Sequence, residues 1–107
     1  MWTPIEEKEI LNLISETELN LDNIQFKIWN SIKIKPEKWS LLPWSDEGNG
    51  FWVVGIYNSY AIYYNDIEDG FNISEYREKG ILLEYQTYQF ELIEIINQIN
   101  ERNQNEK

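Results

Sequence analysis

The residues best suited to chemistry in this sequence are three carboxylates in one short polar segment, residues 65–72. The three are Asp66, Glu68 and Asp69. Clustered carboxylates can bind a hard cation such as calcium. The EF-hand loop does not fit them, because setting Gly70 at its sixth position places Ile67 third and Tyr76 twelfth, where oxygen ligands are required. The spacing therefore predicts no metal site, and leaves either an ordinary acidic turn or a surface that binds a partner.

Carboxylate-pair catalysis is the second chemistry that these acids allow. Glycoside hydrolysis, for example, needs two acids about 5–10 Å apart across a substrate cleft. Asp46 or Glu47 could pair with Asp66 or Glu68, but the spacing singles out no pair. A chain of 107 residues also has little material for a deep pocket. We therefore expect no catalytic residues, and keep a small carboxylate enzyme or ligand-binding domain as the alternative.

Two missing residue types exclude most other site chemistry. The chain contains no histidine and no cysteine. Disulfides, zinc sites built from these residues and histidine general bases are therefore impossible, and we expect no cofactor. Nucleic acid is a disfavoured partner, because phosphate binding depends on Lys and Arg, and here 19 acidic residues oppose 9 basic ones for a net charge of -10.

The negative charge is concentrated in the middle of the chain. Residues 25–38 have four lysines and one glutamate, a local balance of 4 − 1 = +3. Residues 39–76 have no basic residue and six acids. These six are Asp46, Glu47, Asp66, Glu68, Asp69 and Glu75. Such a block is either a solvated surface or a face that steers a basic protein into contact.

Hydrophobic periodicity predicts the elements that would position these acids. A Thr3–Pro4 start and apolar residues at helical spacing predict a helix over about 4–17. Alternating apolar residues over 24–34 favour a strand, with a helix as the competitor because Ile24, Ile28 and Ile32 share an i, i+4 row. Residues 36–50 are expected to form an ordered loop, rich in proline and tryptophan.

The second half of the chain predicts a sheet followed by a helix. Residues 51–57 and 60–65 form a β-hairpin, 71–76 add a third strand, and 81–85 would add a short edge strand. An apolar stripe predicts a helix over about 87–101, with Thr87 as its N-cap. The fold class is α+β, an antiparallel sheet of four to five strands with an N-terminal and a C-terminal helix on one face. Residues 1–101 form one domain, and 102–107 a frayed polar tail.

Both faces of the predicted hairpin are apolar. Phe51, Val53 and Tyr57 point to one face, and Trp52 and Val54 point to the other. If helices cover one face, the second either shows its aromatic side chains to a partner or a second copy, or is buried by a loop. The sequence therefore leaves three alternatives open: a binding surface, a homodimer contact, and a strand that is buried on both faces.

The predicted function rests on a resemblance to other proteins. The stretches that carry it are 36–39 (PEKW), 43–44 (PW), 50–54 (GFWVV) and 64–72 (YNDIEDGFN). With them the chain resembles small acidic bacterial proteins of unassigned activity, which are similar in size and acidity to immunity proteins that neutralise toxins of rival bacteria. The resemblance implies a non-enzymatic role in binding a basic, toxin-like protein.

The predicted partner-binding residues combine the central acids with nearby aromatic anchors. They are Asp46, Glu47, Asp66, Glu68, Asp69, Trp44, Trp52 and Phe71. The N-terminus has no signal-peptide pattern, and no apolar run reaches the roughly 18–20 residues that span a bilayer. We therefore expect a cytoplasmic protein that does not enter a membrane.

Overall fold

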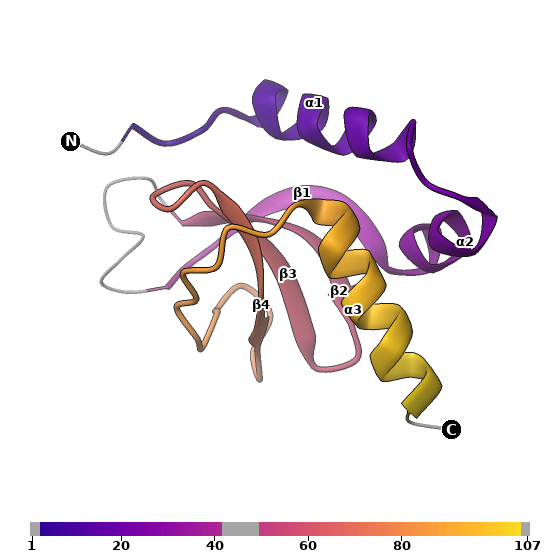
Figure 1. The fold of residues 1–107 in the computed structure, drawn as a ribbon. Coiled ribbons are helices and arrows are strands. Elements are labelled where there is room, and N and C mark those ends of the chain that lie inside the picture. Colours follow the sequence, from indigo (N-terminus) through magenta and orange to yellow (C-terminus); the bar gives the residue numbers. More distant parts are fainter. Residues whose placement is uncertain (1–2, 42–49, 106–107) are drawn as a thin grey trace.

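The computed structural model describes residues 3–41 and 50–105, and within them the fold is α+β, as predicted. Four antiparallel strands form one sheet in the order β1-β2-β3-β4 (Figure 1). The helices are α1 (Glu7–Glu18), α2 (Asn23–Ile32) and α3 (Leu92–Asn105). The strands are β1 (Lys33–Trp39), β2 (Phe51–Tyr57), β3 (Tyr60–Asn65) and β4 (Gly70–Glu75).

One face of the sheet packs against the helices. Apolar residues at helical spacing on α1 and α3 meet side chains from β2, β3 and β4 in a single buried cluster. Its fully buried members include Ile10, Trp29, Val54, Ile62 and Ile96. Trp29 also donates a hydrogen bond of 2.8 Å from its indole Nε1 to Glu18, which ties α2 to α1. The helical face therefore holds the main core.

The opposite face of the sheet is covered by residues 80–90, which we call the strap (orange in Figure 1). Leu82 of the strap is buried in a second apolar cluster with Phe51 and Val53 of β2 and Tyr63 of β3. Ser40 after β1 hydrogen-bonds to Gly80 and Leu82, and Phe71 of β4 to Phe90, so the strap crosses the sheet from one edge to the other. Among residues 3–41 and 50–105, both faces are thus covered, and the sheet presents no open aromatic face to a partner or a second copy.

The strap is held by hydrogen bonds to polar side chains of the sheet, and not by regular strand pairing. The Tyr63 hydroxyl donates to the Glu84 carbonyl at 3.0 Å and accepts from the Gln86 backbone N–H at 2.8 Å. Asn72 pairs with both backbone groups of Tyr88, and the Ser74 hydroxyl accepts from two strap N–H groups. Since buried backbone groups need partners, these side chains allow an irregular segment to lie on the sheet.

Replacing Tyr63 with phenylalanine tests this role. The change removes one hydroxyl and leaves one strap carbonyl and one strap N–H without a protein partner, so we expect a loss of about 1–2 kcal/mol in the free energy of unfolding. Urea denaturation of the two proteins measures it. The matched control is Tyr88→Phe, because Tyr88 lies in the same strap with its side chain 58% exposed. Equal stability of the two variants would contradict an anchoring role for Tyr63.

Two elements differ from the sequence prediction in the first half of the chain. The predicted strand over 24–34 is wrong, because residues 23–32 form α2 and the strand begins only at Lys33. Asp22 and Gln25 form a reciprocal capping box, a helix start that outweighs the alternating pattern. Part of the predicted 36–50 loop is strand β1, where Pro36 is tolerated because β1 is an edge strand.

The elements around the strap also differ from prediction. Residues 81–85 form no strand, and only Ile81 makes an isolated bridge, to Ser40. The last helix begins at Leu92 and not near Thr87, because residues up to 90 are still bonded to the sheet. It continues to Asn105, into the stretch predicted as a polar tail. Within the residues that the structure describes, no helix combines the length and apolar character that crossing a bilayer requires.

Candidate partner-binding groove

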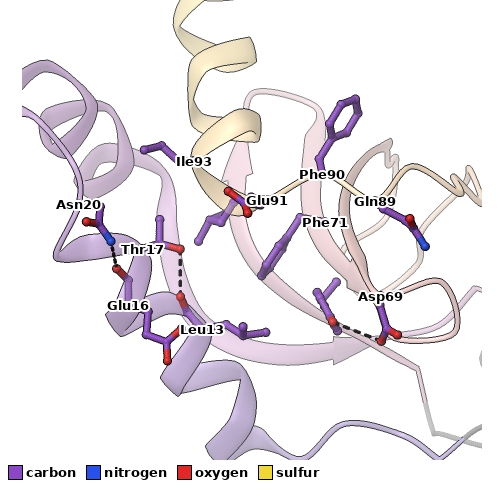
Figure 2. Close-up of a pocket in the computed structure, with 12 residues that line it drawn as sticks. Leu13, Glu16, Thr17, Asn20, Asp69, Phe71, Gln89, Phe90, Glu91 and Ile93 are labelled. Atoms are coloured by element: carbon purple, nitrogen blue, oxygen red, sulfur yellow. Dashed lines mark hydrogen bonds between the residues drawn. The ribbon is translucent and has the colours of Figure 1, made fainter.

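A hollow lies between α1 and the start of α3, over the ends of β3 and β4 (Figure 2). Its volume is about 720 Å³. Leu13, Glu16 and Thr17 line it from α1, and Asn20 lines it from the turn that follows α1, across from Glu91. A volume of this size lies in the range of binding sites for ligands or for several partner side chains.

A second, smaller hollow adjoins the first and shares Asp69 with it. Its volume is about 310 Å³, and it lies between residues 3–6, Glu9 of α1 and the β3–β4 turn. We call the two hollows together the acidic groove. Its carboxylates, three from the larger hollow and three more from the smaller, are Glu16, Asp69, Glu91, Glu6, Glu9 and Asp66. No described residue with a basic side chain lines either hollow, so the groove attracts cations.

Helical spacing places one wall of the acidic groove. Leu13 lies four residues after Glu9, and Glu16 and Thr17 lie three and four residues after Leu13, so these four share one side of α1. Asn20 follows in the turn after the helix. Two of them satisfy their own polar groups locally: Thr17 donates to the Leu13 carbonyl and Asn20 to the Glu16 carbonyl, both at 3.0 Å. The Glu16 carboxylate is exposed, so it is accessible to a ligand.

The β3–β4 turn forms the floor, and buried Asn65 sets its shape. The Asn65 side-chain oxygen accepts the backbone N–H groups of Ile67 and Glu68, and its amide nitrogen donates to the strap carbonyl of Gln86. Asp69 then adopts a positive φ of 58°, a conformation that aspartate tolerates better than most residues. The acidic turn is therefore a defined structure that holds Asp69 at the junction of the two hollows.

The turn also fixes the N-terminal segment beside it. The Asp66 side chain accepts the backbone N–H of Ile5 at 2.7 Å, and Trp52 donates its indole N–H to the Ile5 carbonyl at 2.9 Å. Lys38 lies 5.1 Å from the ring centroid of Trp52, in a cation–π contact. Asp66 and Trp52 thus hold residues 3–6 against the groove, which gives both a structural task.

Tyr64 links the acids to the apolar part of the groove. Its ring makes an edge contact with Phe71 at 4.8 Å between centroids, and its hydroxyl lies 3.5 Å from Asp69. Burial, and to a smaller extent the negative charges of Asp69 and Asp66, raise the pKa of Tyr64 to about 12. A cation bound in the groove would offset these charges and lower the pKa.

An alkaline titration should report this environment. The phenolate absorbance of Tyr64, isolated as the difference between the protein and Tyr64→Phe, should develop with a pKa of about 12. In Asp69→Asn the pKa should fall toward the ordinary value of about 10. Because the folded pKa exceeds the unfolded one, the contribution of Tyr64 to stability is complete below about pH 10 and is lost as the pH rises through about 12. A midpoint near 10 in the native protein would contradict the geometry.

The structure brings part of the predicted site together. Asp66, Asp69 and Phe71 line the groove, although Phe71 is only 4% exposed and belongs to its buried floor. Glu68 lies in the same turn and accepts a hydrogen bond from Gln89 through its backbone carbonyl. Trp52 lies under the N-terminal segment. Three further predicted residues, Trp44, Asp46 and Glu47, lie outside the described residues.

Sequence reasoning missed the acids that come from other elements. Glu6, Glu9, Glu16 and Glu91 are far in the sequence from the central acidic block, and the fold brings them to it. The helical spacing of Glu9 and Glu16 was a usable signal for one wall. Nothing local to Glu91 showed that the start of α3 lies opposite α1.

The chemistry available to the groove is the binding of positive charge. Within the described part of the chain, no group of three or more carboxylates is arranged to hold a metal ion. The carboxylates are instead spread over the lining of the groove, which also includes the apolar side chains Leu13, Tyr64 and Ile93. Such a lining suits a ligand that is both cationic and partly apolar. Comparisons with protein-family models, curated proteins and solved structures gave no match to this chain.

Proposed function

We propose that this protein is a non-enzymatic inhibitor of the immunity type, which binds a basic, toxin-like protein through the acidic groove. The observation that carries the proposal is the lining of the groove: six carboxylates from α1, the N-terminal segment, the β3–β4 turn and the start of α3, with no basic side chain among the described lining residues. A concave surface of one charge sign concentrates field lines and accelerates the encounter with an oppositely charged protein.

The placement of the charges supports binding over a merely solvated surface. Most carboxylates of a soluble protein are dispersed or paired, whereas here they line a hollow that also exposes apolar side chains. Like charges on facing walls repel and weaken the fold. A partner with Lys or Arg side chains would relieve that repulsion, and its apolar side chains would gain the contact area on which affinity depends.

The test uses the protein encoded beside this chain in its genome. If that neighbour is basic and toxic, co-expression with this chain should restore growth, and the two purified proteins should form a complex at low ionic strength. Titration calorimetry measures the affinity, and chemical-shift changes on labelled protein locate the interface. A neighbour that is not basic, a pair that does not associate, or shifts confined to the surface away from the groove would reject the proposal.

A second candidate is a small ligand-binding domain that uses the same carboxylates. One observation favours it: the larger hollow is concave, with Glu16, Asp69 and Glu91 in its lining, and its size suits a small molecule. The ligand class would be an organic cation such as a polyamine. Titration with spermidine separates the candidates, because only a dedicated site would bind it at a defined stoichiometry and at physiological ionic strength.

A further inference from the structure

We infer that the partner enters the acidic groove as a cationic amphipathic α-helix lying alongside α1. This inference rests on the proposed function and specifies the part of the partner that is recognised. The groove is bordered by the lining face of α1, from Glu9 to Thr17, and by Asn20 in the turn that follows. At 1.5 Å per residue the helical part of this face, from Glu9 to Thr17, is about 12 Å long, a little over two helical turns.

The backbone hydrogen bonds around the groove favour a helix over an extended segment. An extended peptide gains its affinity by pairing with a free strand edge. The edge of β4 beside the groove is already engaged, because Phe71 donates its N–H to the Phe90 carbonyl at 2.9 Å. The side-chain amide of Asn72 next to it bonds both backbone groups of Tyr88, which keeps the strap against this strand. A bound helix satisfies its own backbone groups, and therefore needs only side-chain contacts from the groove.

The apolar and charged side chains of the lining match one face of such a helix. Leu13 on α1, Ile93 on α3 and the Tyr64 ring are each partly exposed and line the larger hollow. Figure 2 shows Glu16 on the α1 side of the hollow, and Asp69 and Glu91 on the side of the sheet and α3. A helix with an apolar stripe flanked on both sides by Lys or Arg presents the complementary pattern.

A synthetic peptide tests the inference without the natural partner. The probe has about 18 residues of leucine and lysine, with leucine at helical spacing. One control peptide has the same composition with leucine and lysine alternating, as in a strand, and a second is oligolysine of equal charge. The helical peptide should bind at least about tenfold more tightly than either control, gain helical circular dichroism on binding, and shift the resonances of residues 13–20 and 89–93.

A pair of variants locates the peptide in the groove. Thr17→Arg places a cation of the chain itself between the two walls, and should weaken binding of the helical peptide at least about tenfold. Ser15→Arg adds the same charge on an exposed position of α1 that lines neither hollow, and should change binding less than about twofold. Both substitutions favour helix, so folding is expected in each and is checked by circular dichroism.

The outcomes separate this inference from the proposed function. Equal binding of the alternating peptide would show an extended ligand, and equal binding of oligolysine would show attraction by charge alone; either overturns the helix inference. Equal weakening by Thr17→Arg and Ser15→Arg would also overturn it, because the peptide would then lie elsewhere. Specific binding of the helical peptide together with no complex between this chain and its neighbour would reject the proposed function and leave the helix site standing.

Discussion

Replacing Gly70 with alanine is expected to lower the free energy of unfolding by about 3 kcal/mol or more. Gly70 begins β4 and is fully covered by the strap. A Cβ atom at this position would overlap the Tyr88 carbonyl oxygen and the Gln89 Cα, both of which are backbone atoms. A flexible side chain can move aside from an added methyl group, but backbone cannot without displacing the whole segment. The strap would therefore have to lift away from β4.

Displacement of the strap breaks the hydrogen bonds that hold it. The bond between the Phe71 N–H and the Phe90 carbonyl and the paired bonds of Asn72 to Tyr88 lie directly beside Gly70. Chemical denaturation with an unchanged m-value measures the loss. The matched control is Gly80→Ala at the other end of the strap, where the added Cβ meets nothing within 4 Å and the positive φ of 99° is the only cost, about 1–2 kcal/mol. If the two variants are equally stable, close packing at Gly70 does not hold the strap.

The strap matters to function because its last residues form part of the groove. Gln89 and Phe90 line the larger hollow, and Glu91 follows them at the start of α3. The same contacts that fix the strap at Gly70 therefore fix the position of one acidic wall. A Gly70→Ala protein that still folds should lose affinity for a cationic ligand even though no carboxylate has been removed.

Much of the sheet could be predicted from the sequence because its signals are local. The hairpin of β2 and β3 followed from two β-rich runs joined by Asn58 and Ser59, and the structure confirms it. Asn58 adopts the positive φ of 53° that such a short turn requires. The helix over α1 and the α+β class were likewise confirmed. The hydrophobic period and the turn residues that determine these elements all lie within a few residues of one another in the sequence.

The strap could not be predicted because its partners lie far away in the sequence. Residues 80–90 have no regular period, since they are held by side chains of Tyr63, Asn65, Asn72 and Ser74 that belong to β3 and β4. Those polar residues alternate with apolar ones in their strands, and a local reading places them on a solvent-facing side. Only the tertiary fold shows that they face a second covering layer.

The site was half predictable for the same reason. The acidic turn at 66–69 is visible in the sequence as a cluster, and it forms the centre of the groove. The exposed acids of α1 read locally as an ordinary solvated helix face, because amphipathic helices show charge toward water. Their grouping with the turn depends on where α1 lies, which neither composition nor spacing determines.

Neutralising three acids of the larger hollow should slow the association with a basic partner about tenfold at low ionic strength. The variant combines Glu16→Gln, Asp69→Asn and Glu91→Gln. Each change keeps the size of the side chain, and asparagine tolerates the positive φ at position 69. Stopped-flow mixing with the basic neighbour protein measures the association rate. The dissociation rate should change less, because the lost electrostatic attraction acts mainly while the two proteins approach each other.

The control must separate the groove from net charge. Glu7→Gln, Glu78→Gln and Glu101→Gln remove the same three negative charges from exposed positions that line neither hollow. If the field of the groove guides the partner, this second variant associates faster than the first at low salt, and the two converge as salt screens the charges over about 10 Å. If both variants slow association equally at every salt concentration, only the overall charge of -10 matters. The carboxylates would then be a solvated surface, and the groove would have no part in recognition.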